Sequence, residues 1–270
     1  MNELVKSLLR YPGGKTAFVK QILPYFQGHN EVFSPFFGGG VVELNLEKMN
    51  KRIYGCDRFQ QLVHFWNFAI NETDSLFELV KKHWFFFHDD SISDEEKKEY
   101  YYNLKKNCVQ PDQIDTLQSA ANFFVVNRIS YSALTLLGGF SKSNIKMEFG
   151  KGILERLQYF KVKNISVECI DFEESFKKYG HFMIYADPPY YLHKGWLYGE
   201  DGSIHRDFNH KALRDLLVQR DNWVLSYNNC NEIRELYKGF RMIEPTGKWS
   251  MKKQKTSKEL LILGNGIKLK

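Results

Sequence analysis

Apolar positions along the chain follow two spacings, one typical of strands and the other of helices. Short runs rich in aromatic and β-branched residues predict buried strands near 32–33, 53–57, 165–170, 182–186, 223–227 and 259–263. Stretches with apolar residues every three or four positions predict helices that begin near 41 and span about 62–70, 75–87, 94–107, 115–128, 153–160 and 210–219. Strands that alternate with helices indicate an α/β fold built on an open sheet.

Residues 61–149 interrupt this alternation, because helices follow one another there. We therefore expect residues 1–60 and 150–270 to form one α/β domain and residues 61–149 to form an inserted helical subdomain. The aromatic cluster at 84–87 is expected to be the core of that insertion rather than a surface for stacking.

Composition narrows the class of protein. The 270 residues are 43% apolar, which is enough for a large core, and 38 basic against 32 acidic residues give a net charge of +6, which favours a polyanionic partner. The four cysteines form no CxxC pair and no histidine lies at metal-ligand spacing, so we expect no metal site. No signal peptide and no apolar run of membrane-spanning length is evident, so we expect no membrane partner and a cytoplasmic location.

The strand at 182–186 ends in Asp187, Pro188, Pro189 and Tyr190. Ligands of open α/β sheets bind at this edge, and paired prolines stiffen a loop while leaving its carbonyls free. A carboxylate, a free carbonyl and an aromatic ring suit an exocyclic amino group on a flat base such as adenine. An Asp-Pro-Pro turn that merely closes a strand is the alternative.

Two glycine-rich segments precede this loop. RYPGGK at 10–15 places a lysine at a helix start, and PFFGGG at 35–40 joins a strand to a helix in the pattern F-x-G-x-G. That pattern favours S-adenosylmethionine over a dinucleotide, because no pyrophosphate needs to be held. Asp57, at the end of the next strand, is suited to binding ribose hydroxyls, and a surface aspartate is the alternative.

These motifs, with Asn127 to Tyr131 (NRISY) and the closing KELLIL, stand in the order seen in the Dam-type DNA adenine-N6 methyltransferases (D12 class, alpha group), which the chain resembles over most of its length. The resemblance implies a Rossmann-like fold, the cofactor S-adenosylmethionine and double-stranded DNA as partner. It also implies that residues 1–60 and 150–270 are catalytic and that 61–149 recognises DNA. Asp187, Pro188, Pro189 and Tyr190 are the catalytic loop. The predicted cofactor-binding residues are Tyr11, Lys15, Phe36, Gly38, Gly40, Asp57, Asp171, Phe172 and Asp187.

DNA contacts are expected from three segments. The resemblance implies that Arg10 and the segment around Asn127 and Arg128 reach DNA, and that Tyr131 wedges into the duplex where an adenine is flipped out. GATC-specific members have an arginine where this chain has Leu136, so a different recognition site is expected. Residues 247–258 hold five lysines and no acid, and they predict phosphate contacts by Lys252, Lys253 and Lys255 or else a solvated hairpin tip.

We therefore predict an enzyme that transfers a methyl group from S-adenosylmethionine to adenine N6 in duplex DNA by base flipping. A methyltransferase acting on RNA or on a protein glutamine, and a non-catalytic DNA-binding module, are the alternatives. The protein is expected to act as a monomer in the cytoplasm or at the nucleoid, with a cognate restriction endonuclease as a candidate partner.

Overall fold

The computed structural model describes residues 3–110, 114–191, 208–245 and 258–267. Within them lies a seven-stranded sheet of order β3-β2-β1-β4-β5-β7-β6, in which the first five strands are parallel and β7 runs antiparallel to β5 and β6. The predicted Rossmann-like fold is confirmed. The strands are β1 (Glu31–Ser34), β2 (Arg52–Asp57), β3 (Ile165–Cys169), β4 (Met183–Ala186), β5 (Trp223–Asn228), β6 (Arg241–Ile243) and β7 (Glu259–Leu263).

The order of the strands reverses between β1 and β4. The chain runs outward from β1 to β2 and β3, returns to β4, and then continues outward on the other side. Such a reversal opens a crevice at the carboxyl ends of the two central strands. Ser34 and Ala186 end these strands, so the PFFGGG and DPPYY segments both start at that crevice.

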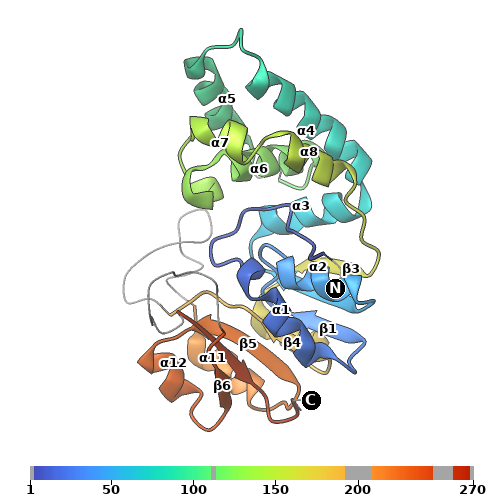
Figure 1. Cartoon of the computed structure of the whole chain (residues 1–270), viewed down its shortest axis with the longest axis vertical. Helices are drawn as coiled ribbons and strands as arrows, with labels where there is room; N and C mark the ends of the chain where they lie inside the picture. The colour runs from blue at the N-terminus through green and yellow to red at the C-terminus, as the bar shows by residue number, and fades with distance from the viewer. Residues whose placement is uncertain (1–2, 111–113, 192–207, 246–257, 268–270) are drawn as a thin grey trace.

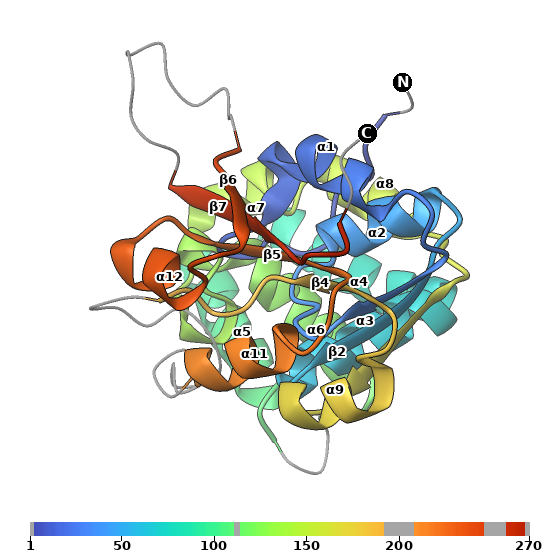
Figure 2. The same cartoon turned by 90° about the horizontal axis from the view of Figure 1, so that it is seen from below.

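Side chains along the central strands point alternately to the two faces of the sheet, and each face belongs to an apolar cluster. Val32 and Met183 join one apolar cluster, and their neighbours Phe33 and Ile184 join the other. Figure 2 shows α1 and α2 on one side of the sheet and α9, α11 and α12 on the opposite side. The helices around the sheet are α1 (Val19–Ile22), α2 (Val41–Lys48), α3 (Gln60–Asn71), α9 (Phe172–Tyr179), α11 (His210–Leu217) and α12 (Asn231–Leu236).

The remaining helices form a layer above the sheet in the view of Figure 1. Helix α6 is at its centre and is buried on all sides, which explains why its sequence is apolar without a polar face. Helix α5 begins at a capping box made by Ser93 and Glu96. The bounds are α4 (Thr73–His88), α5 (Asp94–Asn107), α6 (Leu117–Ile129), α7 (Lys142–Met147) and α8 (Lys151–Gln158). Helices α4, α5, α6 and α8 lie within about two residues of the predicted helices, and α7 was not predicted.

One continuous apolar core joins the two layers. It includes Ile53 and Val224 of the sheet together with Phe87 and Tyr101 of the helical layer. Helix α3 contacts both β2 and β3 and also packs on α6, so it belongs to both layers. The division at residues 61–149 stays a prediction.

Two further features concern only the residues that the structure describes. No helix among them is long and apolar enough to cross a membrane. They contain no group of three or more histidine, cysteine or acidic side chains placed to hold a metal ion.

Candidate active site

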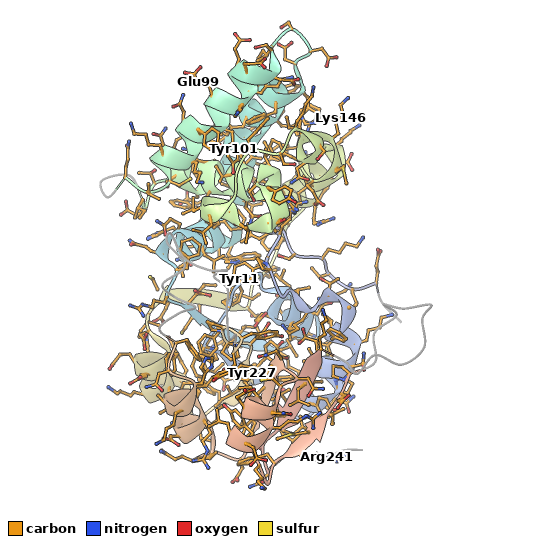
Figure 3. The ribbon with its side chains drawn as sticks, turned by 90° about the vertical axis from the view of Figure 1, so that its left-hand side faces the viewer. Tyr11, Glu99, Tyr101, Lys146, Tyr227 and Arg241 are labelled. Carbon is orange, nitrogen blue, oxygen red and sulfur yellow. The ribbon has the colours of Figure 1, made fainter. Side chains whose placement is uncertain are left out.

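Every residue predicted to bind the cofactor or to act in catalysis lines a single cavity at the crevice between β1 and β4. Figure 3 shows Tyr11 between Tyr101 of the helical layer and Tyr227 of the sheet. The cavity therefore lies where the two layers meet. The predicted residues that line it are Tyr11, Lys15, Phe36, Gly38, Gly40, Asp57, Asp171, Phe172, Asp187, Pro188, Pro189 and Tyr190.

The glycine-rich turn allows Tyr11 to form part of the wall. Gly38 and Gly40 have φ angles of 48° and 65°, in the left-handed region that favours glycine. A Cβ on Gly38 would lie 3.0 Å from a ring carbon of Tyr11, so these glycines also permit a close approach within the protein. The backbone of the turn is held by the Asp57 side chain, because the Gly38 N–H donates a hydrogen bond to Oδ2 of Asp57 at 2.9 Å.

Asp57 closes one end of the cavity. Its second carboxylate oxygen accepts a hydrogen bond from the Phe59 N–H at 3.0 Å. Burial raises the pKa of Asp57, although both N–H groups favour the charged form and oppose that shift. Each oxygen keeps a lone pair for a further donor.

Three phenylalanine rings form an aromatic part of the cavity wall. The ring centroids of Phe36, Phe172 and Phe208 lie 5.3 to 5.7 Å apart, so the rings pack against one another. Asp171 is the N-cap of α9 and accepts a hydrogen bond from the Glu173 N–H at 2.9 Å, so this predicted cofactor residue also starts a helix. An aromatic wall of this kind suits one face of a flat heterocycle.

Lys15 and Asp187 form a charge pair at the other end of the cavity. Nζ of Lys15 donates a hydrogen bond to Oδ2 of Asp187 at 2.8 Å and lies 2.8 Å from Oδ1. Burial raises the pKa of Asp187 to about 6, and the charge of Lys15 opposes this rise. The Asp187 carboxyl, whose side chain is 23% exposed, is thus mostly ionised at pH 7.

Glu259 supports this pair from the last strand. Its carboxylate accepts a hydrogen bond from the Tyr190 hydroxyl at 2.5 Å and lies 4.0 Å from Nζ of Lys15. Nζ also lies 4.9 Å from the centre of the Tyr190 ring. The Glu259 side chain therefore links Tyr190 to strand β7.

The side chain of Asn228 holds the DPPYY loop through its backbone. Asn228 accepts a hydrogen bond from the Tyr191 N–H at 3.0 Å and donates one to the Tyr191 carbonyl at 2.8 Å. This amide is at the end of β5, so the loop is fastened to the neighbouring strand.

Three of the predicted DNA contacts form a buried network with Glu148, which we call the arginine cluster (Arg10, Asn127, Arg128 and Glu148). The Asn127 side chain accepts a hydrogen bond from the Arg10 N–H at 2.8 Å and donates one to its carbonyl at 2.7 Å. Arg128 donates to the Glu148 carbonyl at 2.7 Å and to its carboxylate at 3.1 Å. Burial lowers the pKa of Arg128 to about 10, opposed by Glu148.

The arginine cluster leaves these side chains little access to DNA. Asn127 is 1% exposed and Arg128 is 7% exposed. Nη1 of Arg10 donates to the carbonyls of Arg128 and Ser130, at 3.1 and 2.9 Å. In this arrangement Asn127 and Arg128 fasten the RYPGGK segment to α6, because a side chain enclosed by protein cannot also contact a duplex.

Tyr131, in contrast, points into solvent. Its side chain is 65% exposed, at the start of a loop in which Ser132, Ala133 and Thr135 all have positive φ. Left-handed backbone is costly for residues with a side chain, so neighbouring contacts must hold the loop. Leu136 lies at the loop's buried side, in a surface groove shared with Lys105 and Lys106. The predicted contacts Lys252, Lys253 and Lys255 lie outside the described residues.

Comparison with known proteins gives the family. Residues 11–251 match the model of the D12 class N6 adenine-specific DNA methyltransferases. The chain belongs to this family. Two similar proteins, both named DNA adenine methylase, come from the Classical Ogawa and El Tor Inaba strains of Vibrio cholerae serotype O1. Each is 24% identical over 256 residues, which cover 88% of this chain and 86% of the relative.

This methyltransferase therefore acts on adenine in DNA and uses S-adenosylmethionine, which confirms the predicted activity and cofactor. The alternative activities on RNA and protein, and the non-catalytic module, are set aside because the matched family is specific for adenine in DNA.

Sequence reasoning missed several residues of the site. Glu259 was part of a predicted strand only, and its place beside Tyr190 depends on the antiparallel pairing of β7 with β5. Glu43 follows the glycine-rich turn and lines the cavity, but it resembles an ordinary polar residue in the first turn of a helix. An acid at an otherwise apolar helical position was the only available signal.

Proposed function

We propose that this methyltransferase binds S-adenosylmethionine along the cavity and presents one flipped adenine to the DPPY loop, with each predicted residue acting where it lines the wall. The observation that carries the proposal is the gathering of all these residues around one cavity at the switch point of the sheet. Segments 170 residues apart in the sequence would not converge there by local structure alone.

The donor groups of the cavity match the parts of the cofactor. The phenylalanine wall suits one face of the adenine ring, and the lone pairs of Asp57 suit the ribose hydroxyls. The opposite charges of Lys15 and Asp187 suit the carboxylate and ammonium of the methionine end. When bound, S-adenosylmethionine supplies a methyl group that its sulfonium already activates.

The catalytic loop holds the target amino group. The Asp187 carboxylate and the Pro188 carbonyl accept its two N–H hydrogens, which turns the nitrogen lone pair toward the methyl group. The Tyr190 ring stacks on the extruded base, and Glu259 keeps that ring in place through the hydroxyl. A pKa of about 6 leaves Asp187 ionised and able to accept near neutral pH.

The predicted DNA contacts are of two kinds, one direct and the other indirect. Exposed Tyr131 is the wedge that occupies the gap left by the flipped adenine. Asn127 and Arg128 act indirectly, by holding the RYPGGK segment and the start of the Tyr131 loop against each other. Arg10 could reach a base edge only by giving up its hydrogen bonds to two carbonyls.

One catalytic cavity per chain flips one adenine at a time. We therefore propose a monomer that methylates the two strands of a short site in separate events, with or without a companion restriction endonuclease. Leucine at position 136 cannot donate to guanine, so the site is not read as the GATC-specific enzymes read theirs.

Long-read sequencing of DNA from a methylase-free host that expresses the chain tests the proposal. We expect N6-methyladenine at one short motif, on both strands. The same host expressing Asp187→Asn is the control and should show far less modified adenine at that motif. Modification restricted to GATC would refute the specificity argument, and modified cytosine would refute the assigned target.

A further inference from the structure

Glu43 is a buried acid in the cavity that the proposed chemistry does not use. It is 2% exposed, in the first turn of α2, and its side chain is among those that line the cavity. The Ser34 hydroxyl, at the end of β1, donates a hydrogen bond to Oε1 at 2.7 Å. Among the residues that the structure describes, no positively charged side chain lies within ion-pair distance of the Glu43 carboxyl, so its burial is not explained by a salt bridge.

The surroundings of Glu43 identify the end of the cavity that it faces. The charges that act on it are those of Asp187 and Lys15, which come from the DPPY loop and from the segment before α1. Buried Tyr185 of β4 is a further titratable neighbour, while Asp57 of β2 is held by its own backbone partners at the opposite end. Glu43 is thus a second acid at the end where the Lys15 and Asp187 pair lies.

Burial decides the protonation state of this acid in the ligand-free chain. Burial raises the pKa of Glu43 to about 8, opposed by the hydrogen bond from Ser34. The side chain is then mostly protonated at pH 7. A neutral carboxylic acid can be buried without an ion-pair partner, and it becomes a strong acceptor only when a cation arrives.

We propose that Glu43 is a cofactor-binding residue that ionises when the ammonium of the methionine end of S-adenosylmethionine enters the cavity. The proton leaves the Glu43 carboxyl for the buffer, and the carboxylate that remains accepts a hydrogen bond from the ammonium. Because Glu43 shares the ammonium with Asp187, one oxygen of Asp187 can accept from the target adenine. This inference rests on the proposed placement of the cofactor.

Calorimetric titration of the full chain with S-adenosylmethionine tests it. Binding heats at pH 7 in two buffers of different ionisation enthalpy give the number of protons exchanged. We expect the wild type to release most of one proton and Glu43→Gln to release almost none. Asp187, already mostly ionised at pH 7, contributes little. Glu47→Gln, on the same helix outside the cavity, is the matched control and should behave as the wild type.

S-adenosylhomocysteine separates the two cations of the cofactor, because it keeps the ammonium and lacks the positive sulfur. Proton release should persist with it, and release seen only with S-adenosylmethionine would overturn the assignment to the ammonium. If Glu43→Gln does not fold, as its melting curve would show, the wild type alone decides. Binding without proton release would overturn the inference and leave the proposed function standing, whereas no binding by the wild type would overturn both.

Discussion

The cavity and the arginine cluster both bury charged side chains, but they satisfy them with different partners. In the cavity, Lys15 is paired mainly with the carboxylates of Asp187 and Glu259 and also donates to the Gly13 carbonyl, and one wall is open to a ligand. In the arginine cluster, the two arginines donate mainly to backbone carbonyls and to Glu148. Ligand groups can replace side-chain partners, but they cannot replace backbone that the fold holds in place. The first arrangement is suited to binding and the second to joining segments.

This difference predicts separate consequences for mutations in the two regions. Changes in the arginine cluster should lower stability, because they leave buried groups without partners. Changes at Asp187 in the cavity should mainly lower binding or turnover, because Lys15 keeps Glu259 and the Gly13 carbonyl as partners and the fold stays supported.

The largest effect is expected from Arg128→Ala in the arginine cluster. Removing the Arg128 side chain leaves the Glu148 carbonyl without its donor, takes one of two arginines from the Glu148 carboxylate and opens a cavity, at a combined cost of about 3–5 kcal/mol in the free energy of unfolding. Urea denaturation measures it. Lys151→Ala, which removes an exposed charge, is the control and should change stability by less than about 0.5 kcal/mol. Equal stability of the two variants would place Arg128 outside any structural role.

Asp187→Asn, in the cavity, should change turnover rather than stability. The amide keeps the size of the side chain but removes the negative charge and one acceptor, so kcat at saturating cofactor should fall by about 10²–10³. Transfer of labelled methyl groups to DNA gives kcat, and the melting temperature should stay close to that of the wild type. The matched variant Asp171→Asn changes another acid of the cavity, and we expect its kcat to stay within a few-fold. Near-normal turnover by Asp187→Asn would remove Asp187 from catalysis.

Tyr131→Ala probes the exposed edge of the recognition segment. Loss of the wedge should slow methylation of a paired adenine about tenfold, because the wedge offsets a part of the few kcal/mol that unstacking the base costs. Methylation of a mismatched adenine should slow less. Single-turnover rates on the two duplexes give the comparison. Tyr131→Phe keeps the ring and should retain the wild-type ratio of rates. Equal slowing on both duplexes would argue for a general contact rather than a wedge.

The smallest effect is expected in the Tyr131 loop. Ala133 has a φ of 61°, which costs an alanine free energy that a glycine avoids. Ala133→Gly should therefore stabilise the chain by up to about 1 kcal/mol, while Ala121→Gly inside α6 should destabilise it by at least about 0.5–1 kcal/mol. Thermal unfolding of the two variants distinguishes them. A loss of stability in both would show that the loop does not hold Ala133 in this conformation.

The sequence by itself determined six of the seven strands, most of the helices and the segments that line the cavity. These features are local: strand and helix periodicity, the glycines of the turn and the prolines after Asp187 act through their neighbours in the chain. Short elements such as α7, α12 and β6 gave no such signal and were not predicted.

Only the tertiary structure decided the partners of the polar side chains. Asn127 faces Arg10 across 117 residues and Glu259 faces Tyr190 across 69, so neither role could be predicted from its own segment. An asparagine at this position can contact DNA if it lies at the surface, or join two segments of the chain if it is buried. Packing of distant elements decides between these two roles, because a buried polar group must find its partner within the fold.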